Sequence, residues 1–252
     1  MIPPLGRWFA KTRESGPAGS KWPGRLRQLD PLQWVAPADC LLCGRSVRGP
    51  VCADCSGLFQ SASGKGCRRC ANLLVSDHAL SCPWCCRLRD LPDHLACGFY
   101  YRHEAATLYR LIKFEGYWPL MKHLLEPGMH AFFRIPFLEY DGLVPVPEPF
   151  VKKMSRFFNP SLLLADLLCA RTGLDVLPVV GIRPFSRGQV GLSYAERRAN
   201  ARRRFFLRRA PPERLILVDD VLTTGATLEA MTAVLRAAKV RRIAWFTLLR
   251  TP

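Results

Sequence analysis

The residues best suited to chemistry lie in one short stretch near the C-terminus, LILVDDVLTTGAT, at positions 215–227. Four apolar residues open it, a run typical of a strand buried on both faces of a parallel sheet, and the acidic pair Asp219 and Asp220 ends that strand. Small and hydroxyl-bearing residues then offer successive backbone N–H groups to an anion: Thr223, Thr224, Gly225, Ala226 and Thr227. Apolar residues at helical spacing follow, so we expect this loop at a helix N-terminus, where the dipole favours a phosphate.

Two carboxylates beside an anion site would repel the anion unless something bridges them. Sugar hydroxyls that donate hydrogen bonds to Asp219 and Asp220, or a Mg²⁺ ion, resolve this conflict. We therefore expect the stretch to bind a phosphate group together with sugar hydroxyls or Mg²⁺, with the missing side chain of Gly225 leaving space for the phosphate. An ordinary strand, turn and helix with an acidic turn is the structural alternative.

The full pattern resembles the 5-phosphoribosyl-1-pyrophosphate (PRPP) signature of type I phosphoribosyltransferases. The resemblance implies that residues 223–227 hold the 5-phosphate and that Asp219 and Asp220 face the ribose hydroxyls, with Mg²⁺ accompanying PRPP. It also implies the fold class, an α/β domain with a type I phosphoribosyltransferase-like parallel sheet flanked by helices. No residue is assigned a catalytic role.

Eight cysteines form four pairs that share a spacer of two residues: Cys40, Cys43, Cys52, Cys55, Cys67, Cys70, Cys82 and Cys85. Such a spacer lets both thiolates of a pair reach one ion, so we predict two consecutive zinc ribbons with structural, fully coordinated zinc. Disulfides and an iron–sulfur cluster are alternatives. A chain without an export signal is expected in a reducing compartment, where cysteines stay as thiols and this spacing favours metal binding. Cys86 could replace Cys85 as a ligand, whereas Cys97 and Cys169 are expected to be small buried hydrophobes.

Composition divides the chain into three expected parts. Residues 1–38, rich in Pro, Gly and Ser, are predicted to be a mobile basic leader, 39–95 a double zinc ribbon, and 96–252 a phosphoribosyltransferase-like domain. No uncharged apolar run reaches about 18 residues and the N-terminus has no apolar signal core, so we expect no membrane span and a cytoplasmic protein.

Within the third part, strands are expected at 99–102, 143–147 and 242–249, and helices at 103–114 and 120–133, the second interrupted at Pro127 and Gly128. A further helix is capped by Asn159, starts at Pro160 and ends at Gly173. The loop after strand 143–147 carries Lys152 and Arg156. We expect these cations near the pyrophosphate, because this loop leaves the carboxyl edge of the sheet.

The formal net charge of +17 indicates an affinity for anions, and two four-thiolate zinc sites would lower it only to about +13. Basic residues and Trp84 around the second ribbon are compatible with single-stranded DNA, or equally with a solvated face and one packed Trp. Ten arginines between residues 181 and 214 either close over pyrophosphate or form a track for a polyanion.

Taken in order, these features resemble the ComF (competence protein F) family from about residue 40 to residue 251. The motifs that carry the resemblance are the paired cysteine ribbons, LIKFEG (111–116), VPVP (144–147), Arg156 with Phe158 and Asn159, QVGLSYAERRAN (189–200) and VDDVLTTGAT (218–227). The chain departs from the family's Arg-Gly-Phe-Asn-Gln at 156–160, where it has RFFNP, and this changes the pyrophosphate-side loop.

The resemblance implies a PRPP-binding protein associated with DNA uptake or with the use of DNA. Its partners would include single-stranded DNA and DNA-uptake or DNA-processing proteins. The alternative hypothesis is an active phosphoribosyltransferase of nucleotide metabolism, which transfers the ribosyl group of PRPP to an unidentified acceptor.

Overall fold

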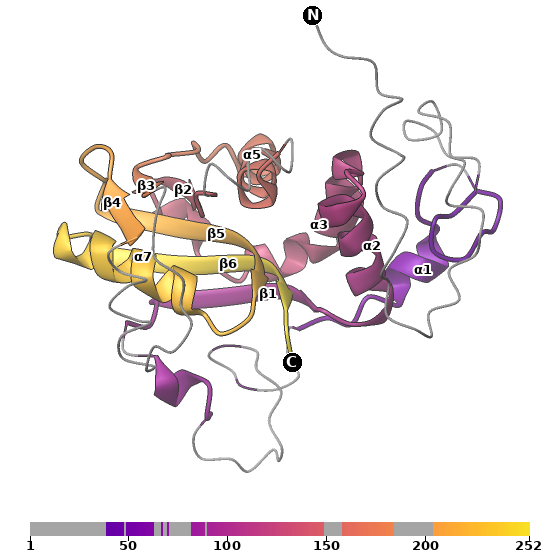
Figure 1. Ribbon diagram of the computed structural model, residues 1–252, viewed down its shortest axis with the longest axis horizontal. Coiled ribbons are helices and arrows are strands. Elements are labelled where there is room, and N and C mark those ends of the chain that lie inside the picture. The colour runs from indigo at the N-terminus through magenta and orange to yellow at the C-terminus, as the bar shows by residue number, and fades with distance from the viewer. Residues whose placement is uncertain are drawn as a thin grey trace, which may run out of the picture.

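A four-stranded parallel sheet forms the centre of the fold (Figure 1). The computed structural model describes residues 39–47, 49–62, 67, 70, 82–88, 90–148, 158–183 and 204–252. The strands, in their order across the sheet, are β1 (His94–Tyr100), β6 (Arg242–Arg250), β5 (Arg214–Leu222) and β2 (Gly142–Pro145). Every neighbouring pair is parallel, so the carboxyl ends of all four strands meet at one edge.

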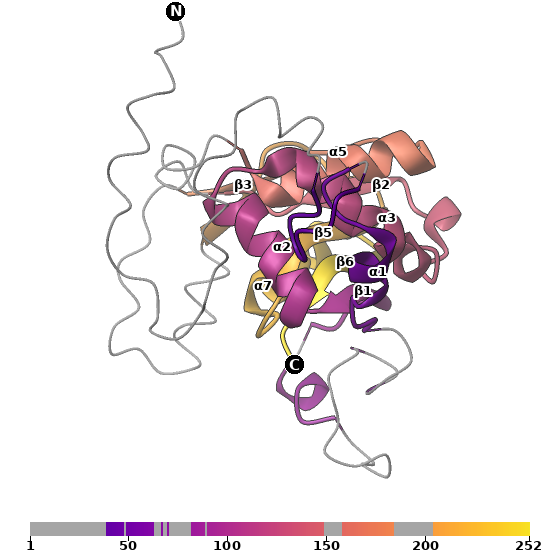
Figure 2. The same ribbon diagram turned by 90° about the vertical axis from the view of Figure 1, so that its right-hand side faces the viewer.

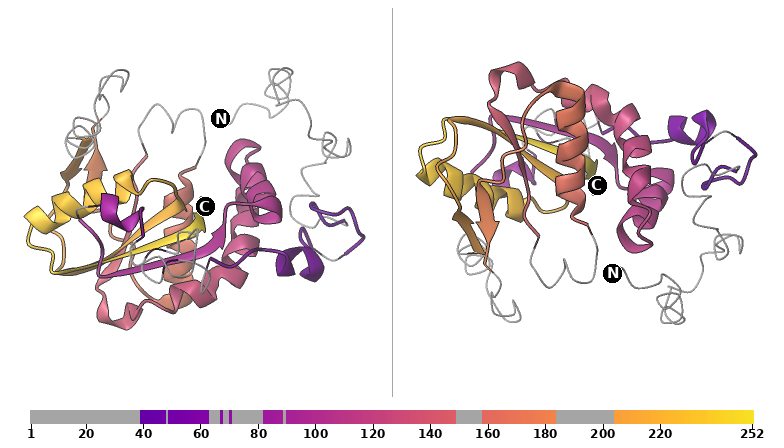
Figure 3. Two further views of the ribbon diagram at one scale, coloured as in Figure 1. Left: turned by 90° about the horizontal axis from the view of Figure 1, so that it is seen from below. Right: turned by 90° about the horizontal axis from the view of Figure 1, so that it is seen from above.

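Helices cover both faces of this sheet, which confirms the predicted α/β class (Figure 3). One face packs against α2 (His103–Phe114), α3 (Met121–Phe132) and α5 (Pro160–Thr172). The other packs against α7 (Ala226–Ala237) and the antiparallel pair of β3 (Val180–Ile182) and β4 (Phe205–Leu207). Short 3-10 turns, η5 (Trp118–Leu120) and η6 (Phe137–Glu139), flank α3. Among the described residues, no helix is both long enough and apolar enough to cross a membrane.

The apolar start of β5 is buried on both sides. Ile216 and Val218 pack toward α2, α3 and α5, while Leu215 and Leu217 pack toward α7, and all four are fully buried. The prediction that the strand ends at the acidic pair is wrong, because β5 continues to Leu222 in register with β6. Its ladder with β6 holds the backbone of the pair extended, and the two carboxylates are therefore presented from a strand and not from a loop.

Local signals predicted the helix boundaries well. α2 has the predicted bounds, and α5 begins after Asn159 and ends at Gly173, whose φ of 75° is the left-handed conformation that favours glycine. The predicted break at Pro127 and Gly128 is wrong, because α3 runs through both residues. A Cβ at Gly128 would lie 3.2 Å from the side chains of Phe99 and Leu248, so the glycine lets α3 pack closely on the sheet, and this packing outweighs the helix-breaking tendency.

The two cysteine-containing segments lie on opposite sides of the edge strand β1 (Figure 2). Residues 60–62, which lie between them in the sequence, follow the outer edge of β1, where Ala62 N–H donates to the Gly98 carbonyl at 3.0 Å and Tyr100 N–H donates to the Gln60 carbonyl at 2.8 Å. The first segment, which includes α1 (Ala53–Gly57), packs beside α2, and Phe59 makes an edge contact with the Phe99 ring at 5.4 Å. The second, which includes η4 (Cys85–Arg87), packs beside α7.

The division of the chain into a leader, a ribbon module and a domain stays a prediction. The expected leader, residues 1–38, lies outside the described residues. The expected boundary between residues 95 and 96 falls inside β1, which begins at His94.

Candidate functional site

A cavity of about 430 Å³ lies at the carboxyl edge of the sheet. Several parts of the chain contribute to it: α2, the segment after β2, the start of α5, the start of β4, the last part of β5 and the first turn of α7. Its lining residues are Lys113, Val146, Pro147, Glu148, Asn159, Pro160, Ser161, Arg204, Phe205, Asp219, Asp220 and Thr227. The volume is in the range of small-molecule sites.

Asp220 is a buried carboxylate with two partners from α2. Lys113 Nζ lies 2.9 Å from Asp220 Oδ2, and the Tyr109 hydroxyl donates to the same oxygen. Burial alone would raise the pKa of Asp220, but the Lys113 ammonium and the Tyr109 hydrogen bond outweigh it and lower that pKa below its ordinary value. Sequence reasoning missed this role of α2, although Lys113 stands in the LIKFEG motif.

Asp219 has the opposite electrostatic environment. It accepts a hydrogen bond from the Ser161 hydroxyl at 2.8 Å and one from the Asp220 backbone N–H at 3.0 Å. Burial, and then the neighbouring Asp220 charge, raise the pKa of Asp219 well above its ordinary value. The pair therefore favours one charged and one protonated carboxyl, and a cation or donor hydroxyls in the cavity would favour ionisation of the second.

Asn159 ties α5 to the end of β2. Its Oδ1 accepts hydrogen bonds from Ser161 N–H at 2.9 Å and Leu162 N–H at 3.3 Å, and its Nδ2 donates to the Val146 carbonyl at 3.0 Å. The predicted N-cap is thus confirmed. The cap also places the Ser161 hydroxyl against Asp219.

Residues 223–227, here called the TTGAT loop, connect β5 to α7. Thr223, Thr224 and Thr227 are exposed, and of the three Thr227 lines the cavity. α7 begins at Ala226, whose N–H donates to Thr224 Oγ1 at 3.4 Å, so the N-terminus of α7 lies at the cavity. Gly225 is buried, with a φ of 77°. The space beside Gly225, expected to hold a phosphate, is instead taken by the Trp84 ring, because a Cβ at Gly225 would come within 2.7 Å of that ring.

One of the predicted cations, Arg204, lies at the cavity, whereas Lys152 and Arg156 cannot be placed. Arg204, one of the ten clustered arginines, lines the cavity together with Lys113. Among the described residues, Arg204 Nε is buried and has no hydrogen-bond partner. Lys152 and Arg156, expected near pyrophosphate, lie outside the described residues, as do 189–200. Among the residues that the structure describes, two cations and three carboxyl groups line the cavity, the carboxyl groups being those of Glu148, Asp219 and Asp220.

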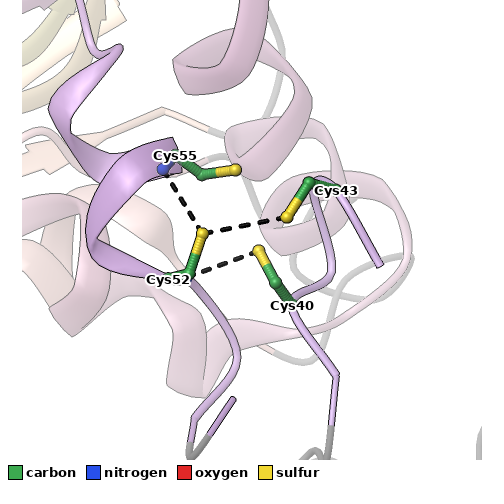
Figure 4. A group of neighbouring side chains, drawn as sticks. All are labelled: Cys40, Cys43, Cys52 and Cys55. Atoms are coloured by element: carbon green, nitrogen blue, oxygen red, sulfur yellow. Dashed lines mark hydrogen bonds between the residues drawn. The ribbon is translucent and has the colours of Figure 1, made fainter. Parts of the chain in front are cut away.

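The eight paired cysteines form two clusters of four. Within each cluster, the four sulfur atoms all lie within 4.8 Å of one another. The first cysteine cluster is Cys40, Cys43, Cys52 and Cys55 (Figure 4), and the second is Cys67, Cys70, Cys82 and Cys85. Sulfur–sulfur distances of 3.8 Å between Cys43 and Cys52 and 3.5 Å between Cys70 and Cys82 match the about 3.8 Å expected for a tetrahedral zinc–thiolate shell. Both clusters could therefore hold structural zinc.

The cysteines differ in their surroundings, because burial raises the pKa of Cys55, and that of Cys85 to about 12, whereas Cys40 shifts the other way. In the first cluster, burial alone would raise the pKa of Cys40, but backbone N–H groups, including that of Cys52, lower it to about 7, which favours the thiolate that a metal needs. Cys85 belongs to the second cluster, whereas Cys86 is exposed and lies outside it. Cys97 is buried and accepts a hydrogen bond from the Thr247 hydroxyl at 3.2 Å, as expected of a core residue.

Comparison with known proteins gives one partial similarity. Competence protein F from Haemophilus influenzae is 32% identical over 108 residues, which cover 41% of this chain and 47% of that protein. The chain thus spans about half the length of the curated relative that it matches. No protein-family model matches the chain. The similarity supports the expected resemblance to the ComF family.

Proposed function

We propose that the cavity at the carboxyl edge of the sheet binds PRPP together with Mg²⁺. The observation that carries the proposal is that an acidic pair and the N-terminus of α7, a pairing suited to a ribose diol and its 5-phosphate, face one cavity. The TTGAT loop would hold the 5-phosphate, and Asp219 and Asp220 would accept hydrogen bonds from the ribose hydroxyls. Lys152 and Arg156 would meet the pyrophosphate.

The carboxyl groups of the cavity suit Mg²⁺, which prefers oxygen ligands and is commonly shared with substrate phosphates. When bound, Mg²⁺ would neutralise charge on the pyrophosphate. Arg204 supplies a cation with a buried, unpaired Nε, and Lys113 holds Asp220 ionised before a ligand arrives. In this proposal, Ser161 orients Asp219 toward the ribose.

Calorimetric titration of PRPP with Mg²⁺ into the zinc-loaded protein tests this proposal. We expect saturable binding, loss of about tenfold or more in affinity for Asp220→Asn, and no change for Asp175→Asn, an exposed aspartate outside the cavity lining. Equal affinity in the parent and Asp220→Asn, or no binding at millimolar PRPP, would contradict the proposed site.

Pyrophosphate release in the same samples separates a binding protein from an enzyme. Release that depends on an added acceptor and disappears in Asp220→Asn would support the alternative, an active phosphoribosyltransferase. Binding without release, across a panel of nucleobases and amines, would support a protein that only senses or stores PRPP.

We further propose an association with DNA uptake or the use of DNA, through single-stranded DNA. Two observations favour it, the net charge of +17 and the similarity to competence protein F. Raising salt from about 50 to 200 mM should weaken DNA binding by orders of magnitude through counterion release, and Arg68→Glu with Arg69→Glu should reduce that slope. Absence of binding at low salt would contradict it.

A further inference from the structure

Trp84 connects the second cysteine cluster to the TTGAT loop. It stands in the two-residue spacer between Cys82 and Cys85, so the cluster fixes the backbone on both of its sides. η4 follows it immediately, and Leu88, just after η4, is buried against the same part of the fold. The segment is held on α7 as well, because Asp90 N–H donates to the Glu229 carboxylate at 3.3 Å.

The Trp84 ring lies against the backbone of the loop. A Cβ at Gly225 would come 2.7 Å from Trp84 and 3.5 Å from Leu88, so only a glycine permits this contact. Trp84 Nε1 donates to the Thr223 carbonyl at 3.1 Å. On the ring face, the Arg250 guanidinium lies 4.6 Å from the ring centroid, within cation–π range.

Arg250 and Trp84 together hold the carbonyl groups at the start of the loop. Arg250 Nη1 donates to the Leu222 carbonyl at 3.0 Å and to the Thr223 carbonyl at 2.9 Å. The described peptide bonds are all trans, so the N–H that follows each carbonyl points the opposite way. The N–H groups of Thr223 and Thr224 therefore point away from the second cluster, and this common orientation is what an anion-binding loop requires.

We propose that Trp84 is a positioning residue for the TTGAT loop, and that the second cysteine cluster, by holding Trp84, sets the affinity of the loop for a 5-phosphate group. This inference rests on the proposed function of the cavity. Without the ring and its donor, Gly225 regains the freedom of a glycine at positive φ, and binding must then order the loop. The first cluster packs on the other face of the sheet and has no such contact among the described residues.

The test compares Trp84→Ala and Trp84→Phe, which keeps a ring but lacks the Nε1 donor, with Phe133→Ala, an aromatic that is 56% exposed at the end of α3. Ribose 5-phosphate probes the loop, and magnesium pyrophosphate probes the other end of the cavity. We expect Trp84→Ala to weaken ribose 5-phosphate binding about 10- to 50-fold, Trp84→Phe less, and neither to change magnesium pyrophosphate binding. Hydrogen exchange at the loop, measured without ligand, should be faster in Trp84→Ala. The amides that report it are those of Ala226, which donates to Thr224 Oγ1 at 3.4 Å, and of Glu229, which donates to the Gly225 carbonyl at 2.8 Å.

A second part of the experiment tests the role of the cysteine cluster, with two matched cysteine variants. Cys85→Ser removes a ligand of the second cluster and Cys43→Ser removes one of the first, so each should lose about one zinc by elemental analysis. Only Cys85→Ser should reproduce the weaker ribose 5-phosphate binding and the faster exchange of the loop.

Unchanged exchange and affinity in Trp84→Ala, or equal effects of Cys85→Ser and Cys43→Ser, would overturn the inference. If the parent binds no ribose 5-phosphate, the proposed function fails, and the ligand-free exchange still decides the inference. Faster exchange in Trp84→Ala and Cys85→Ser, but not in Cys43→Ser, supports the positioning role. Unchanged exchange in all three refutes it.

Discussion

The ion pair between Lys113 and Asp220 allows a quantitative test of how the cavity is built. The two side chains are 23% and 12% exposed, and their charged atoms lie 2.9 Å apart. Removing one partner of a buried pair destabilises proteins by about 3–5 kcal/mol, and partial exposure of this pair reduces the value expected for Lys113→Met to about 2–3 kcal/mol. Asp220→Asn should have a smaller effect, because the amide oxygen still accepts from Tyr109.

A double-mutant cycle isolates the interaction. Urea unfolding of the zinc-loaded parent, Lys113→Met, Asp220→Asn and the double variant should give a coupling energy of about 1–2 kcal/mol. The matched control is the surface pair of Arg171 and Glu126, 54% and 45% exposed, where Arg171→Met should change stability by less than about 0.5 kcal/mol.

The contribution of the Lys113–Asp220 pair to stability should also change with pH in a defined direction. Because the pKa of Asp220 is lowered in the folded state, its stabilising contribution is present above the unfolded value of about 4 and is lost as the pH falls through the folded value. The destabilisation by Lys113→Met should therefore shrink between pH 7 and pH 3. A coupling energy near zero, or a destabilisation that does not change with pH, would refute this account of Asp220.

Three further predictions concern other parts of the structure. The purified protein should contain about two zinc ions, and Cys43→Ser about one, by elemental analysis; a metal-free protein that melts at the same temperature would contradict the ribbons. Gly225→Ala should destabilise the fold by about 1–3 kcal/mol in urea unfolding, because it combines a φ of 77° with a clash against Trp84, and an unchanged midpoint would count against that contact. Binding of PRPP with Mg²⁺ should release protons at pH values above about 4 and below the raised pKa of Asp219, where that carboxyl is protonated in the free protein. Titrations in buffers of different ionisation enthalpy should show this release, and Asp219→Asn should abolish it.

Local sequence signals predicted the fold well where one segment determines the outcome. The apolar run of β5, the cap at Asn159 and the glycine at 173 each act within a few residues, and the structure has them where they were predicted. The break at Pro127 was wrong, since the contacts of α3 with the sheet come from distant strands and are not visible in the helix sequence. The pair of β3 and β4 was missed because each strand has only three residues.

The candidate site shows the same division between local and long-range information. Its acidic pair and the TTGAT loop are contiguous in sequence, so both could be predicted from one motif. Their role in binding a ligand stays a prediction. Lys113 and Ser161 come from other helices, 107 and 58 residues away from their aspartate partners, so only the fold reveals those contacts. From the sequence, Trp84 is compatible with DNA stacking or with packing, and its contact with Thr223, 139 residues away, supports packing.

The pairing of residues 60–62 with β1 has a consequence for solubility. β1 is the last strand on its side of the sheet, and the hydrogen bonds of Ala62 with Gly98 and of Tyr100 with Gln60 occupy backbone groups along its outer side. An uncovered edge strand can pair with strands of other molecules and so begin aggregation. Residues 60–62 thus cover the outer edge of β1. Proteolysis that removes this pairing should promote intermolecular association even when both cysteine clusters stay intact.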